Sequence, residues 1–230
     1  LSREEIIADV QALQKQGHKR VLMLMGDHPK YSFDEFLEAL KLVSSIKTAP
    51  HGDIRRINVE IPSLTNEEFQ RLKATDNIGT YTLFQETYHR ETYEKVHKYG
   101  KKADYDWRLE TMDRAQQNGI GDVGIGALFG LYDYRFEVLG MLMHAQHLDR
   151  TYNTGPHTVS IPRIKPTPNT PFACAPPYPV DDTAFKKLIA VIRCALPYTG
   201  IILSTREGPE IRRELYDIGV SQISAGSKTS

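Results

Sequence analysis

Short apolar runs alternate with helical patterns along the whole 230-residue chain. The first run, Val21–Met25, holds no polar residue, which is typical of a strand buried on both faces of a sheet. Similar runs predict six further strands, at residues 57–61, 81–84, 123–129, 158–161, 201–203 and 220–223. A helical pattern precedes the first strand and follows every strand except the last. This strict alternation predicts a parallel α/β sheet.

Seven strands behind an opening helix predict a (β/α)8 TIM barrel that is incomplete because its own first strand is missing. Such barrels typically need about 250 residues, slightly more than the 230 present. A doubly wound open sheet is the competing architecture, but no Gly-x-Gly-x-x-Gly follows the first strand. The proline-rich stretch 162–179 is expected to be an extended loop, too short to separate domains. We therefore expect one domain over residues 1–230.

Helix boundaries are marked by capping residues. Ser2 is followed three residues later by Glu5, a capping-box pattern that starts a helix at the very beginning of the chain. A chain that opens on a helix cap is expected to be cut from a longer protein. Residues 106–118 form one amphipathic pattern, and Gly119 is expected to end that helix.

The composition excludes several classes of function. The 29 basic residues are balanced by 29 acidic ones, so no nucleic-acid-binding footprint or polybasic membrane patch is expected. The longest apolar runs are far shorter than the roughly 18 residues of a membrane span. Cys174 and Cys194 form neither a close-spaced metal pair nor a disulfide framework. We read them as reduced thiols and expect a cytoplasmic protein.

Chemically versatile residues follow most of the predicted strands. In a parallel barrel, the carboxyl ends of the strands and the loops after them form the active site. In chain order, this rule selects residues 26–28, 85–89, 123–130, 160–163, 204–207 and 224–227.

Each of these residues also has a purely structural explanation. Glu86 is as well explained by a solvated loop carboxylate as by a functional one. Gly124 and Gly126 inside a strand allow a ligand to approach closely, but tight packing is the better explanation for either glycine alone. Arg163 and Arg206 can pair with rim carboxylates or clamp the carboxylate of a ligand.

Two further patterns have an ordinary alternative. Residues 224–227 form either a plain turn or a nest of backbone N–H groups that holds an anion. His144 and His147 are spaced as a metal pair, but no carboxylate lies near them on the same helix face, so a metal site is not expected. The residues alone thus indicate a barrel enzyme for a small anionic ligand, and they leave open whether that ligand contains a nucleoside.

Taken together, the strand-end segments resemble the aromatic amino-acid lyase branch of the radical S-adenosylmethionine (SAM) enzymes. The resemblance covers residues 1–227 and includes the tyrosine lyases of [FeFe]-hydrogenase maturation, with those of thiazole synthesis as near neighbours. The second part of the chain, from about residue 114 to residue 230, also resembles the biotin and thiamin synthesis associated (BATS) region. The segments that carry the resemblance are 84–89, 112–115, 121–126, 128–133, 155–163, 204–207 and 224–227.

The resemblance implies a radical reaction. A [4Fe–4S] cluster reduces SAM to a 5′-deoxyadenosyl radical, which removes a hydrogen from the amino group of L-tyrosine. The Cα–Cβ bond then breaks, giving p-cresol and dehydroglycine. In the hydrogenase-maturing members, dehydroglycine yields carbon monoxide and cyanide, and the other maturases and an electron donor are partners. A thiazole-pathway tyrosine lyase, a tryptophan lyase and a cluster-less binding barrel are the alternatives.

The resemblance also assigns roles to residues. It places Gly26 and Asp27 against the methionine amino group of SAM, although Asp27 replaces the usual Glu and has a shorter reach. Glu86 is placed to contact the ribose or the amino group, and Arg108 to pair with the SAM carboxylate. The strand against the adenine contributes Val123, Gly124 and Gly126.

For the amino-acid substrate, the resemblance implies that Arg206 and Ser224 hold the carboxylate, with Arg163 as a weaker candidate. A bidentate guanidinium suits this task. No catalytic residue and no metal ligand is assigned within the chain.

Two departures from the family pattern limit what the chain is expected to do. The Cys-x3-Cys-x2-Cys motif that holds the cluster is absent and is expected just before Leu1, and a second cysteine set is expected beyond Ser230. We therefore expect the chain by itself to lack lyase activity. A missing first strand would leave residues 21–25 with an open edge, so the isolated chain is expected to dimerise or aggregate.

Overall fold

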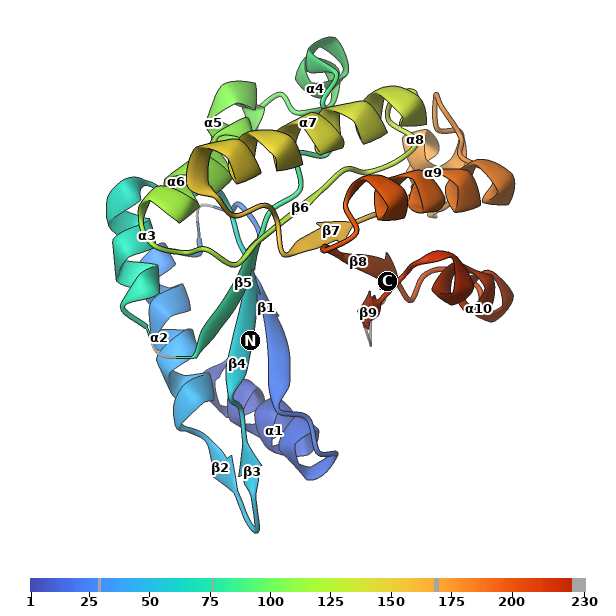
Figure 1. Ribbon diagram of the computed structural model, residues 1–230. Coiled ribbons are helices and arrows are strands. Elements are labelled where there is room, and N and C mark those ends of the chain that lie inside the picture. Colours follow the sequence, from blue (N-terminus) through green and yellow to red (C-terminus); the bar gives the residue numbers. More distant parts are fainter. Residues whose placement is uncertain (29, 76, 168–169, 225–230) are drawn as a thin grey trace. The chain divides into compact units, whose positions relative to one another are not determined.

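A computed structural model describes residues 1–28, 30–75, 77–167 and 170–224. The chain divides into two compact units. Unit 1 comprises Leu1–Leu83, Gly100–Lys102 and Glu110–Val123, and unit 2 comprises Phe84–Tyr99, Ala103–Leu109 and Gly124–Ser230. Both units are built from parallel strands that alternate with helices (Figure 1).

Unit 1 carries three parallel strands in the order β1-β4-β5. Their register pairs Val21 with Ile57 and Ile57 with Ile78. A short antiparallel hairpin of β2 and β3, which the sequence did not reveal, extends from this unit. The elements are α1 (Arg3–Lys15), β1 (Arg20–Leu24), α2 (Phe33–Ser45), β2 (Lys47–Thr48), β3 (Gly52–Asp53), β4 (Arg56–Glu60), α3 (Asn66–Lys73), β5 (Ile78–Thr82) and α6 (Thr111–Gln117).

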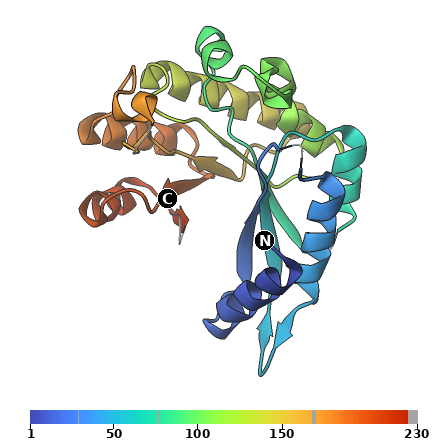
Figure 2. The same ribbon diagram turned by 180° about the vertical axis from the view of Figure 1, so that it is seen from behind.

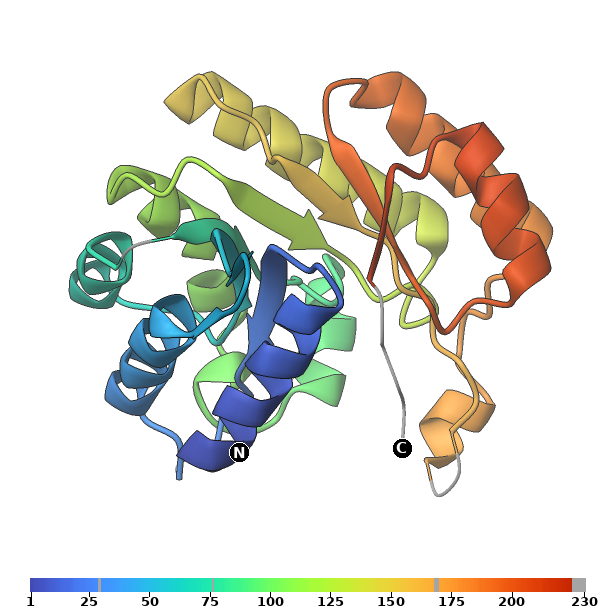
Figure 3. The ribbon, with the colours of Figure 1, turned by 90° about the horizontal axis from the view of Figure 1, so that it is seen from below.

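Unit 2 carries the strands β6-β7-β8-β9, also in chain order and all parallel. Helices α7 and α9 pack side by side, and α10 packs against α9 (Figures 2 and 3). The elements are α4 (Arg90–Val96), α5 (Tyr105–Leu109), β6 (Val123–Gly126, its first residue in unit 1), α7 (Tyr134–Tyr152), β7 (Thr158–Ser160), α8 (Pro171–Cys174), α9 (Asp182–Ala195), β8 (Gly200–Ser204), α10 (Pro209–Ile218) and β9 (Gln222–Ser224). A 3-10 turn, η1 (Lys101–Ala103), lies between α4 and α5.

The core of each unit follows from the apolar runs. In unit 1, alternate residues of β4 are buried, and the ring of Phe69 packs edge-on against Tyr81 with centroids 4.9 Å apart. In unit 2, every residue of β6 and β7 is buried, as expected for strands covered on both faces. No helix in the described parts of the chain is long and apolar enough to cross a membrane.

The helix start predicted at Ser2 is confirmed, and two further helices of unit 1 begin in the same way. Ser2, Ser32 and Thr65 each accept a hydrogen bond from the backbone N–H of a glutamate three residues on, and each glutamate reaches back to the cap. Gly119 follows α6 with a φ of 82°, which suits glycine.

The prediction of one helix over residues 106–118 was wrong, because two helices, α5 and α6, meet at Glu110. Arg108 and Arg114 both bury their guanidinium groups, and each donates to a different backbone carbonyl, of Phe84 and Leu64 respectively. In one straight helix these two positions would lie about 120° apart around the axis. The break lets each side chain reach its own partner.

The loop of residues 162–179 was expected to be extended, which was wrong for residues 171–174. It contains the one-turn helix α8, which begins at Pro171. Proline is tolerated at the first position of a helix, because the N–H that it lacks has no partner within the helix there.

Candidate functional site

The chain turns sharply where it leaves β5. We call Phe84–His89 the Glu86 turn, because Glu86 has a φ of 70°, a left-handed conformation that costs a non-glycine residue about 1–2 kcal/mol. Hydrogen bonds hold the turn against the segment at the end of β6: Gln85 N donates to Gly126 O at 3.0 Å, and Leu128 N donates to Glu86 O at 2.8 Å. Strain that the surroundings enforce in this way is typical of functional sites.

Arg108 of α5 holds the same turn and pairs with Glu86. Its Nε donates to Phe84 O at 2.6 Å, and its Nη2 lies 3.3 Å from Glu86 Oε1. The Arg108 side chain is 8% exposed and that of Glu86 is 16% exposed, so solvent screens this ion pair only weakly. The structure thus brings together two of the residues that the sequence assigned to SAM binding.

The charges of this pair suit the amino-acid part of SAM. That part carries a carboxylate, which needs a donor such as the Arg108 guanidinium, and an ammonium group, which needs an acceptor such as the Glu86 carboxylate. The donor set for an iron–sulfur cluster does not fit. The chain has two cysteines in all, both exposed, and three thiolates are required. Among the described residues, no group of three or more histidine, cysteine or acidic side chains could hold a metal ion.

The remaining residues assigned to SAM lie in different surroundings. In unit 1, Gly26 and Asp27 are exposed just after β1, and an added Cβ at Gly26 would meet nothing within 4 Å. Val123, Gly124 and Gly126 are fully enclosed in β6.

Gly126 has a packing reason to be glycine. An added Cβ there would lie 2.8 Å from Phe84 Cδ1 and 2.9 Å from the backbone oxygen of Ser160. Tight packing, the alternative explanation for this glycine, is therefore observed. Its contact with adenine stays a prediction.

We expect Gly126→Ala to destabilise the protein even without SAM. The added methyl group meets a backbone oxygen that cannot move away easily, and overpacking of this kind typically costs about 1–3 kcal/mol. Thermal unfolding followed by circular dichroism, with and without SAM, is the measurement. Gly121→Ala, where an added Cβ would meet nothing within 4 Å, is the matched control. An unchanged melting temperature together with weakened SAM binding would assign Gly126 to ligand contact instead.

Arg163 lies in a buried network in unit 2. Its Nε and Nη2 donate to the two carboxylate oxygens of Glu207 at 2.8 and 2.7 Å. Nη2 also donates to Asp182 at 2.6 Å, and Nη1 donates to Val180 O at 2.9 Å. The guanidinium lies 4.5 Å from the ring centroid of Phe185. Of the two explanations offered for Arg163, the pairing with carboxylates of the protein is therefore observed. A role in binding the substrate stays a prediction.

Arg206 and Ser224 belong to neighbouring strand ends. Ser224 of β9 is paired in register with Ser204 of β8, and Arg206 Nε donates to Ser204 Oγ at 3.1 Å. Arg206 is exposed, unlike Arg163. The structure brings the two substrate candidates to the same edge of unit 2, while residues 225–227 of the predicted anion nest lie outside the described residues.

Sequence reasoning missed Glu137, a fully buried carboxylate in the first turn of α7. It accepts hydrogen bonds from the Thr87 hydroxyl and from Tyr88 N, the latter at 2.7 Å. Burial raises the pKa of Glu137, and these two hydrogen bonds only partly oppose the rise. A helical wheel would have revealed it, because Glu137 shares the buried face of α7 with Met141, Ala145 and Leu148.

His144 of α7 also has a role that differs from metal binding. Its Nδ1 lies 3.0 Å from the Tyr88 hydroxyl, so a hydrogen bond joins the helix to the Glu86 turn. His147 is exposed on the same helix.

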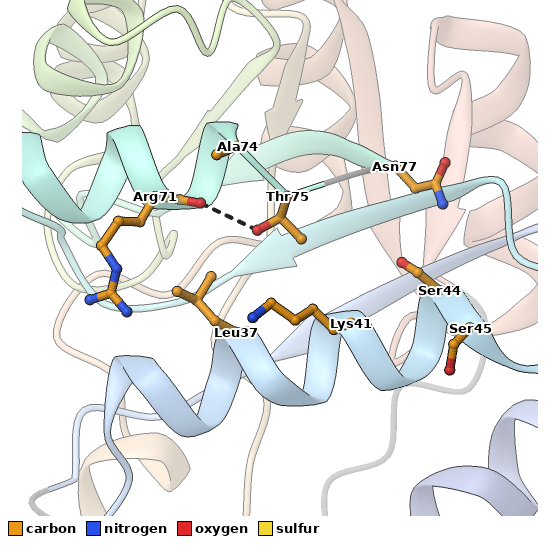
Figure 4. Close-up of a pocket in the computed structure, with 8 residues that line it drawn as sticks. All are labelled: Leu37, Lys41, Ser44, Ser45, Arg71, Ala74, Thr75 and Asn77. Carbon is orange, nitrogen blue, oxygen red and sulfur yellow. Dashed lines mark hydrogen bonds between the residues drawn. The ribbon is translucent and has the colours of Figure 1, made fainter.

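A cavity of about 640 Å³ lies in unit 1, and its lining includes Asn77, just before β5 begins. It is lined by residues of α2, by Arg71 of α3 and by Ala74, Thr75 and Asn77 between α3 and β5 (Figure 4). Its two basic side chains, Lys41 and Arg71, are paired with Glu38 and Asp34 at the surface. It shares no residue with the strand-end positions.

Comparison with known proteins agrees with these observations. The model of the radical SAM superfamily matches residues 1–142, and that of the biotin and thiamin synthesis associated domain matches residues 160–230. A crystal structure of HydG, a maturase of the [FeFe]-hydrogenase, is 50% identical with a TM-score of 0.94, over 99% of this chain and 50% of that chain. HydG from Carboxydothermus hydrogenoformans is 47% identical with a TM-score of 0.89, over 100% of this chain and 52% of that chain.

Curated relatives are more distant. The 2-iminoacetate synthases of Salmonella typhimurium and Escherichia coli are each 31% identical over 100% of this chain and 58% of their own length. The chain thus spans little more than half of the relatives it matches. The predicted fold, an incomplete radical SAM (β/α) barrel, is confirmed, and so is the resemblance to HydG with 2-iminoacetate synthase as a neighbour. The chain belongs to the radical SAM superfamily.

Proposed function

We propose that the full-length protein containing this chain is a radical SAM tyrosine lyase that cleaves the Cα–Cβ bond of L-tyrosine. The ion pair between Arg108 and Glu86, held on a strained turn at a strand end, is the observation that carries the proposal. The names of two relatives support dehydroglycine as the product. Dehydroglycine and 2-iminoacetate are two names for the same compound, and two curated relatives are named for its synthesis.

The residues of this chain would bind and orient the reactants. Together with a [4Fe–4S] cluster held by the full-length protein, SAM would supply the radical chemistry at the substrate amino group. Arg108 would donate to the carboxylate of SAM, and Glu86 would accept from its ammonium group or its ribose. Arg206 and Ser224, on adjacent strand ends, would hold the tyrosine carboxylate. Holding both partners rigidly supplies much of the rate enhancement in such reactions.

Among tyrosine lyases, we favour the branch of hydrogenase maturation. The chain is 50% identical to a HydG and 31% identical to the 2-iminoacetate synthases. The proposal extends to carbon monoxide and cyanide as later products, and to the other maturases and an electron donor as partners. A tyrosine lyase of thiazole synthesis is the second candidate, supported by the same relatives that are named for 2-iminoacetate.

Product analysis tests the proposal. The reconstituted full-length protein, supplied anaerobically with SAM, a reductant and L-tyrosine, is expected to release p-cresol, carbon monoxide and cyanide. Chromatography measures p-cresol, and chemical trapping measures carbon monoxide and cyanide. p-Cresol alone would indicate the thiazole-type enzyme, and cleavage of tryptophan instead would indicate a tryptophan lyase. Binding of SAM without any product would favour a binding domain. The isolated 230-residue chain is the control and is expected to release no product.

A further inference from the structure

We infer that three residues of α7, Glu137, Gly140 and His144, position the Glu86 turn and thereby set the affinity for SAM. We call these residues the α7 clamp. This inference rests on the proposed contact between Glu86 and SAM. The clamp residues themselves contact the turn, not the ligand, and are therefore positioning residues.

Glu137 holds the turn by its backbone. One carboxylate oxygen accepts from the Thr87 hydroxyl, and the other accepts from Tyr88 N at 2.7 Å. The Thr87 hydroxyl oxygen in turn accepts from His89 N at 3.1 Å. Three consecutive residues after Glu86 are thus tied to one carboxylate. Because Glu137 and Thr87 are both 0% exposed, water cannot replace these hydrogen bonds.

Gly140 and His144 extend the same contact along the helix. An added Cβ at Gly140 would lie 2.6 Å from Tyr88 Cβ, so the helix and the turn approach closely there. His144 Nδ1 reaches the Tyr88 hydroxyl at 3.0 Å. The three positions follow the spacing i, i+3, i+7, which places them on one helix face.

Residues of α5 also hold the turn. The Tyr105 hydroxyl donates to Tyr88 O at 2.8 Å, and Arg108 Nε donates to Phe84 O at 2.6 Å. Residues of both helices therefore bracket Glu86, whose left-handed backbone would relax if either side were released. The clamp and Arg108 act on the same short segment from opposite ends.

A carboxylate at position 137 indicates that this residue orders the turn and does not merely fill space. Neither partner of Glu137 is a cation, and burial raises the pKa of its carboxyl group, so the charge carries a desolvation cost. An apolar side chain of similar size would avoid that cost, but it could not order the backbone of the turn.

The test compares variants of the reconstituted full-length protein by two readouts. Equilibrium dialysis gives the dissociation constant of SAM, and hydrogen exchange with mass spectrometry follows the amides of residues 84–92. Glu137→Leu is expected to raise the dissociation constant about 10-fold and to speed exchange of these amides, because buried donors lose their acceptor. Glu137→Gln keeps an acceptor for Tyr88 N and is expected to stay within about 3-fold of the wild type. Asp149→Asn, on the exposed face of the same helix, is the matched control and is expected to change neither readout.

Thr87→Val provides an independent arm if Glu137→Leu does not fold. It removes two hydrogen bonds of the turn, the one donated to Glu137 and the one accepted from His89 N, but leaves Tyr88 N bonded to Glu137. Both readouts are therefore expected to shift in the same direction by a smaller amount. Unchanged SAM affinity in Glu137→Leu, or in Thr87→Val where the first variant does not fold, would overturn the inference, provided that Glu86→Gln weakens binding. If Glu86→Gln binds SAM as the wild type does, the proposed contact itself is wrong, and the inference about affinity falls with it.

Discussion

Arg108→Met is expected to lower kcat/KM for tyrosine cleavage by the full-length protein about 100-fold or more, through loss of SAM binding. Truncating one partner of a buried charge pair at a binding site costs about 2–5 kcal/mol of binding free energy, and each 1.4 kcal/mol corresponds to about tenfold. The substitution leaves the Glu86 carboxylate without its guanidinium and Phe84 O without its donor. It also removes the cation that we assign to the SAM carboxylate. Steady-state kinetics with varied SAM are the measurement, and the loss should appear mainly in the KM for SAM.

Arg135→Met is the matched control for this substitution. Arg135 lies at the exposed start of α7 and pairs only loosely with Asp133, at 3.6 Å. Its loss is expected to leave both kinetic constants within about twofold of the wild type, as is usual for exposed ion pairs. If Arg108→Met raised the KM for SAM no more than this control, the assignment of Arg108 to SAM would be wrong.

Arg163→Met is expected to lower the free energy of unfolding by about 3–5 kcal/mol at neutral pH, a loss typical of a broken buried ion pair. Glu207, 4% exposed, would keep Lys165 at 2.7 Å but lose its bidentate partner. Urea denaturation at neutral pH is the measurement. Arg206→Met is the matched control, because Arg206 is exposed and bonded to Ser204 alone among the contacts described for it.

The effect of Arg163→Met should depend on pH. Burial raises the pKa of Glu207, but its hydrogen bonds to Arg163 and Lys165 outweigh burial and hold the pKa below the ordinary value of 4.5. A carboxyl group with a lowered pKa stabilises the fold above its ordinary pKa, and this contribution is lost as the pH falls through the lowered value. The difference between variant and wild type should therefore shrink below about pH 4.5. A difference that stays constant with pH would show that Arg163 acts through packing on Phe185.

Strands β6 and β7 were predictable because burial on both faces demands apolar runs. The same expectation was wrong for β1, where Leu22 and Leu24 are exposed although the run is apolar. The prediction for β5, residues 81–84, was displaced toward the carboxyl end: the strand is Ile78–Thr82. Leu83 and Phe84 are as apolar as strand residues, but the chain leaves the sheet there to enter the Glu86 turn. An apolar residue indicates burial, not membership of a strand. Here apolar residues continue beyond the last backbone hydrogen bond of the sheet.

The candidate site was predictable only residue by residue. The rule that strand ends carry the chemistry selected Glu86, and the family resemblance selected Arg108. Their contact joins positions 22 apart in the chain. The contact between Glu137 and Thr87 joins positions 50 apart and has no local signature. The same limit applies to Arg163, whose partners Asp182 and Glu207 determine whether it is available to a substrate.

The left-handed backbone at Glu86 has a consequence for laboratory evolution. Glycine or asparagine would adopt a φ of 70° at lower cost, so selection for heat resistance alone would favour them at this position. Selection for turnover would oppose the exchange, because neither residue offers a carboxylate. At position 86, selection for thermal stability and selection for catalytic activity therefore favour different residues.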